Sequence, residues 1–251
     1  MPPLPSIAAV RPVVLALAPP APGLSRGAAT PCLELLGGSR LINRLLGTLH
    51  GLGLSMPLVV SAEESARPLR AALDPRIPVI SVAGGRCSAL RTVLEHTDEE
   101  LLLLHDAERA LTPAAVVTEV FAALENGIDA VVPVIDLTDS VKEVRPEGLR
   151  NIDRATLAGL QSPRLLRREL LEGVLKQVLG PAASEGTPEA GLERERFDEI
   201  LVALESGAEV RTVQGSHSGF AVRDRLTLWQ AQISLGLARD TSHRHGISRR
   251  D

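Results

Sequence analysis

The chain has 251 residues, a formal charge of −4 and 44% hydrophobic residues, which suits one large α/β domain with an aliphatic core. Aromatic residues make up only 2% and tyrosine is absent, so the stacking platforms that bind single-stranded nucleic acid are missing, and the acidic balance argues against duplex binding. No apolar stretch has the length of a membrane span, no secretory leader is visible and two cysteines cannot form a disulfide framework, so we expect a soluble, reduced, cytoplasmic protein.

The first part of the chain alternates short apolar runs with segments of helical spacing. A Pro-rich leader, residues 1–10, is expected to be loose. Strands are predicted at residues 12–18, 57–61 and 77–82. Helices are predicted at residues 33–36, at 41–52 with Ser39 as a candidate N-cap, and at 88–96.

Four consecutive leucines, residues 101–104, are followed by His105 and Asp106, with Arg109 three residues further on. A pure leucine run is typical of a strand buried on both faces of a parallel sheet, and ligands bind at the carboxyl ends of such strands. Asp106 could hold a divalent cation there, and Arg109 a phosphate. The alternative is structural, with Asp106 capping the next helix and Arg109 as its ion-pair partner.

The second part continues the alternation and interrupts it once. The polar, extended segment 136–153 lacks a helical stripe and is interpreted as a protruding arm. Helices are predicted at residues 113–126, 163–179, 197–206 and 225–238, strands at 130–135 and 209–213, a loop at 180–191 and a disordered tail at 239–251.

This alternation predicts the α/β class, with a doubly wound, mostly parallel sheet of about seven strands and helices on both faces. Residues 11–238 form a single domain in this interpretation, from which the β arm projects.

Several segments resemble the methylerythritol phosphate cytidylyltransferases in their actinobacterial form. H-D-A-E-R (residues 105–109) is similar to the family's His-Asp-Ala-Ala-Arg signature. V-V-P-V-I-D-L-T-D-S-V-K (131–142) resembles its Val-Pro-Val strand and Asp-Thr-Ile-Lys turn. D-R-A-T-L-A-G-L-Q-S-P-R (153–164) and F-D-E-I-L-V-A-L-E-S-G (197–207) resemble two further motifs, in the same order.

The resemblance implies a Rossmann-like nucleotidyltransferase fold, a homodimer formed through the arm, and a reaction of CTP with methylerythritol phosphate that releases pyrophosphate and uses Mg²⁺. The residues that it implies are Gly23, Gly85, Arg86, Ser88 and Asp106 for the nucleotide; Asp106, Arg109, Ser140, Lys142 and Arg154 for the substrate; Arg154 for catalysis; and Asp106 for the metal.

The sequence departs from the family at its phosphate-binding positions. Pro19, Pro20 and Pro22 replace much of the Gly-rich loop and have no N–H to donate. Cys32 and Ala221 stand where the resemblance implies lysines. Arg26, in the same loop, and Arg223, which would share a face with residue 221 on a strand, are candidate replacements in catalysis.

Three functional readings follow. The cytidylyltransferase activity is weak or lost, and the chain is a pseudoenzyme or a regulatory protein; or the enzyme is active through Arg26 and Arg223; or it transfers a nucleotide to another sugar or alcohol phosphate. Cys32 and Cys87 are interpreted as unrelated buried thiols.

Overall fold

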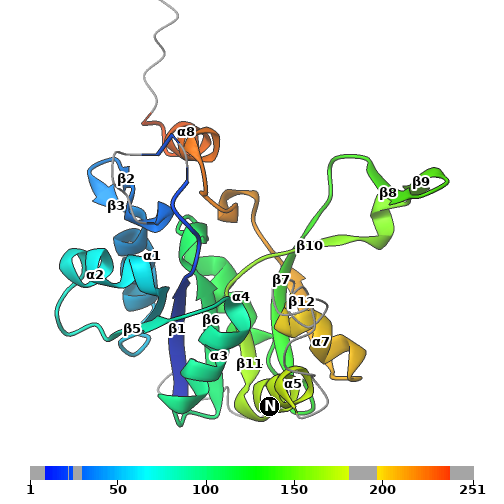
Figure 1. Cartoon of the computed structure of the whole chain (residues 1–251), viewed down its shortest axis with the longest axis horizontal. Helices are drawn as coiled ribbons and strands as arrows, with labels where there is room; N and C mark the ends of the chain where they lie inside the picture. The colour runs from blue at the N-terminus through cyan, green and yellow to red at the C-terminus, as the bar shows by residue number, and fades with distance from the viewer. Residues whose placement is uncertain (1–8, 22, 25–29, 181–196, 238–251) are drawn as a thin grey trace, which may run out of the picture.

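The computed structural model describes residues 9–21, 23–24, 30–180 and 197–237 (Figure 1). Residues 1–8 of the leader, Pro22, Arg26, residues 181–191 of the predicted loop and the tail therefore lie outside the described residues. Among the described residues, none of the helices has the length and apolar character needed to cross a membrane.

An eight-stranded sheet forms the centre of the described chain, in the order β10-β7-β11-β6-β1-β4-β5, with β12 paired to β7. Strands β1, β4, β5 and β6 pair in parallel and β12 is parallel to β7, whereas β10 and β11 run antiparallel to their neighbours. The strands are β1 (Val10–Ala16), β4 (Leu58–Ala62), β5 (Val79–Val82), β6 (Leu101–Asp106), β7 (Ala130–Asp136), β10 (Ala158–Leu160), β11 (Arg164–Arg167) and β12 (Val210–Gln214). The predicted α/β class and mostly parallel sheet are confirmed.

The leucine run lies in β6, between β1 and β11, and is buried on both faces. Leu101 and Leu103 belong to one core cluster, and Leu102 and Leu104 to the cluster on the other face. The first cluster contains side chains of α1 (Leu41–Gly51), α2 (Glu63–Ala72), α4 (Ala114–Ala122) and α8 (Arg225–Ser234). The second contains side chains of α3 (Arg86–Glu95), α5 (Arg168–Leu179) and α7 (Glu199–Glu205).

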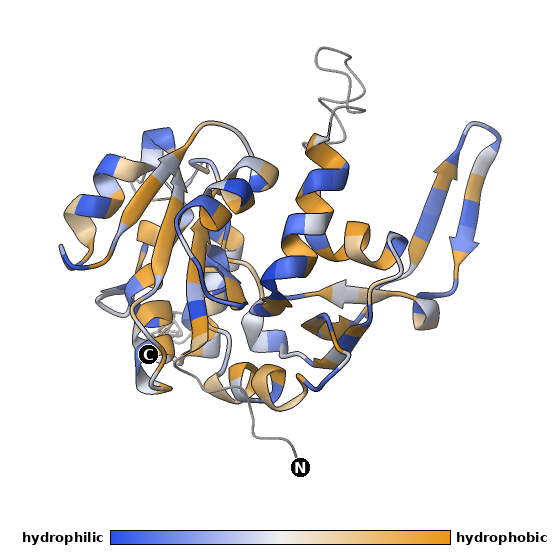
Figure 2. Cartoon of the chain, turned by 90° about the horizontal axis from the view of Figure 1, so that it is seen from below, coloured by the Kyte–Doolittle hydropathy of each residue, from blue (hydrophilic) through white to orange (hydrophobic). Residues whose placement is uncertain are grey.

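The arm is a two-stranded hairpin of β8 (Val141–Arg145) and β9 (Gly148–Ile152) that projects from the end of β7 (Figure 1). Hydrophilic residues dominate it, in contrast to the apolar strands of the central sheet (Figure 2). The apolar residues of the hairpin form two cross-strand pairs, Val141 with Ile152 and Val144 with Leu149, of which Val144 and Leu149 are 81% and 71% exposed. A short 3₁₀ turn, Arg154–Thr156, connects the arm to β10.

Three predictions of local structure were wrong. The predicted helix at 163–179 does not start at residue 163: residues 164–167 form β11, because Leu165 and Leu166 point to opposite core clusters between β6 and β7.

Residues 33–36 are not helical. The 3₁₀ turn Pro31–Leu33 leads into a hairpin of β2 (Leu35–Leu36) and β3 (Ser39–Arg40), whose Gly37-Gly38 turn has positive φ at both glycines. Ser39 therefore pairs with Leu36, and Arg40 is the N-cap of α1.

The position of β6 makes Leu103→Ala a test of the core. Leu103 is fully buried, so truncation should lower the free energy of unfolding by about 2–5 kcal/mol. Leu204→Ala in α7, where the side chain is 51% exposed, is the matched control and should cost less than about 1 kcal/mol. Urea unfolding measures both, and similar losses in the two variants would contradict the central placement of β6.

Candidate functional site

A cavity of about 510 Å³ lies at the carboxyl end of β6, beside the end of β1. The turn before α3 and the segment that precedes α8 complete its wall. Its lining residues are Leu15, Leu17, Ala18, Pro19, Pro20, Ala21, Pro31, Gly85, Arg86, Asp106, Glu108 and Arg223. It occupies the edge where open α/β sheets bind their ligands.

Asp106 reaches this cavity because the buried leucines hold β6 in the middle of the sheet and the strand ends at the carboxylate. Its backbone N–H donates to the Ser162 hydroxyl over 3.1 Å, which joins β6 to the start of β11. The preceding residue, His105, is fully buried, and burial lowers the pKa of its imidazole to about 4. His105 is therefore neutral near pH 7.

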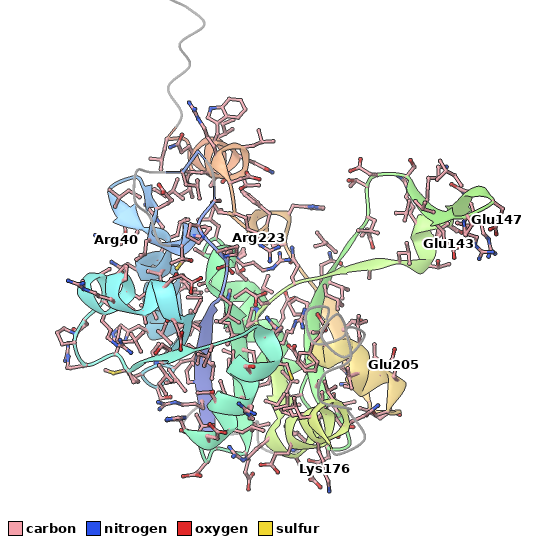
Figure 3. All side chains as sticks on the ribbon, viewed as in Figure 1. Arg40, Glu143, Glu147, Lys176, Glu205 and Arg223 are labelled. Carbon is pink, nitrogen blue, oxygen red and sulfur yellow. The ribbon has the colours of Figure 1, made fainter. Side chains whose placement is uncertain are left out.

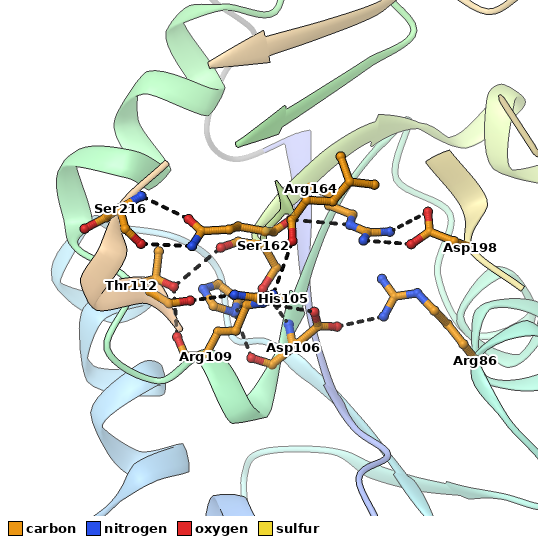
Figure 4. Close-up of polar contacts among 12 residues, drawn as sticks. Arg86, His105, Asp106, Arg109, Thr112, Ser162, Arg164, Asp198 and Ser216 are labelled. Carbon is orange, nitrogen blue, oxygen red and sulfur yellow. Dashed lines mark hydrogen bonds and ion pairs between the residues drawn. The ribbon is translucent and has the colours of Figure 1, made fainter. Parts of the chain in front are cut away.

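Asp106 is one end of a buried network of ion pairs. Figure 4 shows two of them, Asp106 with Arg86 and Arg164 with Asp198. Arg86 donates to Asp106 Oδ1 through Nη1 at 2.7 Å and to both oxygens of Glu199 at 2.7 Å each. Arg164 donates to Glu199 Oε1 at 2.8 Å and to both oxygens of Asp198 at 3.0 and 2.9 Å. The network links the starts of α3, α7 and β11 to the end of β6.

Arg86 holds the pKa values of its two carboxylate partners, Asp106 and Glu199, below the usual range for these groups. Burial alone would raise the pKa of Asp106, but the charge and hydrogen bond of Arg86 outweigh it and lower the pKa to about 2. Burial likewise opposes ionisation of Glu199, which has no exposed surface, yet Arg86 and Arg164 together lower its pKa to about 2.

The guanidinium of Arg109 is used mainly for backbone contacts. Its Nη1 donates to the Gly219 carbonyl at 2.7 Å, its Nη2 donates to the Leu160 carbonyl at 3.2 Å, and its Nε lies 3.8 Å from Asp106 Oδ2. Asp106 does not cap the following helix as the structural alternative proposed, since α4 begins after Pro113 and the Asp106 side chain makes no cap hydrogen bond.

Glu108 adds a second carboxylate to the cavity wall. The residue is 3% exposed, and its Oε1 has no hydrogen-bond partner among the described residues. Burial, with the negative charge of Asp106, raises the pKa of the Glu108 carboxyl to about 7. The sequence interpretation treated this position only as part of a motif and missed its place in the cavity.

The predicted nucleotide residues are only partly brought together. Gly85, Arg86 and Asp106 line the cavity with Arg223, a predicted catalytic residue, whereas Gly23 lines a different cavity, beneath α8. Ser88 lies against the turn instead: a Cβ at Gly84, whose φ is +104°, would be 2.9 Å from the Ser88 hydroxyl. Arg26, a predicted catalytic residue of the Pro-rich loop, is outside the described residues.

The three predicted substrate residues of the arm lie outside this cavity lining. Ser140 is exposed, and Lys142 donates to Asn151 Oδ1 at 2.6 Å across the hairpin. Arg154 donates to the Thr138 carbonyl at the base of the arm. In Figure 3 Arg223 lies near α8, while Glu143 and Glu147 mark the arm at a distance from it.

The positions where lysines were expected carry no cation in the described structure. Cys32 is fully buried in the first core cluster, and burial, with the nearby charge of Glu108, raises the pKa of its thiol to about 12. Cys87 belongs to the cluster on the other face, so the two free thiols are separated by the sheet. Ala221 and Arg223 lie in an irregular segment and not on the strand that was predicted.

The sequence interpretation also missed Arg164, Asp198 and Glu199. The signal was present, since these residues fall in two of the motifs that carried the resemblance, and Asp198 caps α7 through the Ile200 N–H. An acidic residue next to an N-cap is common at helix starts, so only the structure shows that Glu199 points inward between two arginines.

Comparison with known proteins gives one consistent family. The family model for IspD, 2-C-methyl-D-erythritol 4-phosphate cytidylyltransferase, matches residues 30–237. The protein of that description from Saccharopolyspora erythraea is 33% identical over 235 residues, covering 88% of this chain and 99% of the relative. The one from Frankia casuarinae is 33% identical over 231 residues, covering 89% and 82%.

Solved structures share the fold. The 4-diphosphocytidyl-2C-methyl-D-erythritol synthase of Anaerococcus prevotii superposes with a TM-score of 0.72 at 18% identity, over 92% of this chain and 97% of the other. The 2-C-methyl-D-erythritol 4-phosphate cytidylyltransferase of Thermus thermophilus superposes with a TM-score of 0.63 at 19% identity, over 89% and 98%.

Replacing Glu199 with glutamine should destabilise the protein by about 3–5 kcal/mol at pH 7, because Arg86 and Arg164 would lose their shared buried carboxylate. Since the pKa of Glu199 is lowered in the folded state, its stabilisation is fully present above about pH 4.5 and is lost as pH falls towards 2. The difference between wild type and variant, measured by urea unfolding, should therefore shrink as the pH falls below 4.5.

The matched control is Glu172→Gln, which removes the half-exposed partner of Arg168 on the surface of α5. It should cost less than about 1 kcal/mol. A Glu199→Gln protein as stable as this control at pH 7 would show that the buried network contributes little.

Proposed function

Because this chain belongs to the 2-C-methyl-D-erythritol 4-phosphate cytidylyltransferase family, we propose that its cavity at Asp106 binds CTP and that its transfer activity is weak or lost. The nominal reaction joins CTP to methylerythritol phosphate. The substrate phosphate attacks the α-phosphorus of CTP, and pyrophosphate leaves. Two polyanions must meet, so cations have to neutralise the charge of the transition state.

The cavity is better suited to binding the nucleotide than to catalysing the transfer step. Gly85 and Arg86 form the start of α3 at the cavity wall, and free N–H groups at a helix N-terminus favour an anion. Asp106 supplies an acceptor for the nucleotide or a ligand for its metal, as the resemblance implies.

Asp106 fits Mg²⁺ through one oxygen. Arg86 occupies Oδ1 at 2.7 Å, whereas Arg109 Nε is 3.8 Å from Oδ2, beyond a good hydrogen bond, so Oδ2 keeps acceptor capacity. When bound, Mg²⁺ would neutralise charge on the triphosphate. Protein side chains would have to orient the two substrates and neutralise the remaining negative charge of the triphosphate.

The shortage of cations is the observation that carries the proposal of low activity. Pro19 and Pro20 line the cavity without N–H groups, and Cys32 is in the core. Arg86 is engaged by two carboxylates. Of the two arginines in the described lining, only Arg223 makes no ion pair within 4.0 Å.

Arg223 also supports the second candidate, an active cytidylyltransferase in which Arg223 and Arg26 replace the lysines. The exposed side chain of Arg223 lines the cavity and is long enough to move with a bound phosphate. The third reading, transfer to another sugar or alcohol phosphate, has only the shared fold in its favour.

We also propose that the arm pairs two copies of the chain. Ser140, Lys142 and Arg154 are outside the cavity lining of their own subunit, so in a two-fold dimer they would serve a phosphorylated alcohol bound near the partner's cavity. The exposed pair of Val144 and Leu149 supplies an apolar contact on an otherwise polar hairpin.

Pyrophosphate release from CTP, Mg²⁺ and methylerythritol phosphate tests the proposed activity. We expect a rate at least about 100-fold below that of the Saccharopolyspora erythraea relative under the same conditions, since losing a fixed electrostatic donor costs two to three powers of ten. Arg223→Ala should lower any residual rate further, whereas Arg67→Ala, at an exposed arginine of α2, should leave it unchanged. A wild-type rate equal to that of the relative would refute low activity and favour the second candidate.

Light scattering at micromolar concentration tests the arm. Wild type should have the mass of a dimer, and Val144→Asp with Leu149→Asp should give monomers because two charges would be desolvated at the interface. Leu204→Asp, at an exposed leucine of α7, is the control and should remain dimeric. A monomeric wild type would argue against this assembly.

A further inference from the structure

The Glu108 carboxyl is a buried group that the proposed reaction does not use. Its side chain lines the cavity at Asp106, it is only 3% exposed, and its Oε1 has no hydrogen-bond partner among the described residues. A buried acceptor without a partner costs free energy comparable to a lost hydrogen bond. Such an atom at a cavity wall indicates a ligand that completes it.

Local structure fixes the position of this carboxyl. Glu108 is the middle residue of the 3₁₀ turn Ala107–Arg109, which follows β6 directly. Its backbone carbonyl accepts from the Val222 N–H at 2.8 Å, and this bond joins the turn to the segment that carries Arg223. The Glu108 side chain therefore projects from a turn whose backbone is bonded to the segment that carries Arg223.

The charged neighbours of Glu108 leave room for a cation. Asp106 is a second carboxylate of the cavity lining, and Arg223, on the segment before α8, lines the same cavity and its charge acts on Glu108. No ion pair joins Glu108 to an arginine of the described chain within 4.0 Å, and the guanidinium of Arg86 is taken by Asp106 and Glu199. Arg109, whose charge also acts on Glu108, donates to the Gly219 and Leu160 carbonyls, and the Cys32 thiol is protonated because its pKa is raised to about 12.

Both carboxylates have an oxygen available to a ligand: Oδ2 of Asp106 keeps acceptor capacity, and Oε1 of Glu108 has no hydrogen-bond partner among the described residues. Hard divalent cations prefer such oxygen ligands. A polyphosphate entering the cavity would otherwise meet the negative charge of Glu108 directly. A cation between them would remove this repulsion and satisfy Oε1.

We propose that Glu108 and Asp106 together form a site that binds a divalent cation even when no nucleotide is bound. The proposal rests on the proposed function only in assigning the cavity to a metal-bound nucleotide, and it requires no transfer activity. Glu108 stands where the family resemblance implies an alanine, so this ligand would be an addition in this chain that accompanies the loss of the two lysines.

Titration of the full chain with Mn²⁺ alone, followed by the electron paramagnetic resonance signal of free Mn²⁺, tests the site. Wild type should bind one Mn²⁺, and Mg²⁺ should displace it. Glu108→Gln and Glu108→Ala should each weaken the affinity by about ten-fold or more, the range for removing a group that supports a metal site. Glu119→Gln, at an exposed glutamate of α4, should leave the affinity unchanged.

Circular dichroism of each variant tests whether the variant is still folded, so that a loss of affinity can be told from a loss of structure. The alanine and glutamine variants test the role of Glu108 independently. Absence of Mn²⁺ binding by wild type, or an affinity within two-fold of wild type in both folded Glu108 variants, would overturn the proposal. Cation binding that depends on Glu108, without any pyrophosphate release, would support the cation site but not an active cytidylyltransferase. Transfer activity with unchanged cation affinity in the variants would uphold only the active enzyme.

Discussion

Glu199 and its two arginines are the interaction on which the geometry of the site depends. Arg86 and Arg164 come from α3 and β11, far apart in the sequence, and one fully buried carboxylate holds both. Arg86 then reaches Asp106 at the end of β6. Desolvating several charges is costly, and this cost is offset only while every member of the network is paired, so α3, α7, β6 and β11 are constrained to one arrangement.

This arrangement has consequences for the chemistry of the cavity. An arginine that is held by two carboxylates can orient them, but it has little remaining capacity to neutralise a phosphate. Cys32 in the core supplies no cation to the cavity, the prolines of the loop supply no N–H donors, and Glu108, with a carboxyl pKa of about 7, adds negative charge above that pH. Core packing and the buried network use neither Cys32 nor Ala221 as a cation, so the family fold does not depend on lysines at these two positions.

The sheet and much of the candidate site were predictable from particular residues. The four leucines before Asp106 indicated a doubly buried strand, and the end of a central parallel strand is a place where ligands bind. The strand β11 was not predictable in the same way, because Leu165 and Leu166 continue without a break into the helical spacing of α5. Adjacent leucines suit a buried strand and a buried helix equally, and pairing with β6 and β7 decided between them.

The sequence by itself determined the α/β class and the family, and it placed Cys32 and Ala221 where the resemblance implies lysines, since these follow from periodicity and from the residue type at each position. Only the tertiary structure decided that Cys32 lies in the core, that Glu199 lies between Arg86 and Arg164, and that Glu108 lines the cavity with Asp106. The reason is physical: burial and ion pairing depend on neighbours that are distant in sequence, as Arg86 and Glu199 are, and no local pattern records which of them meet.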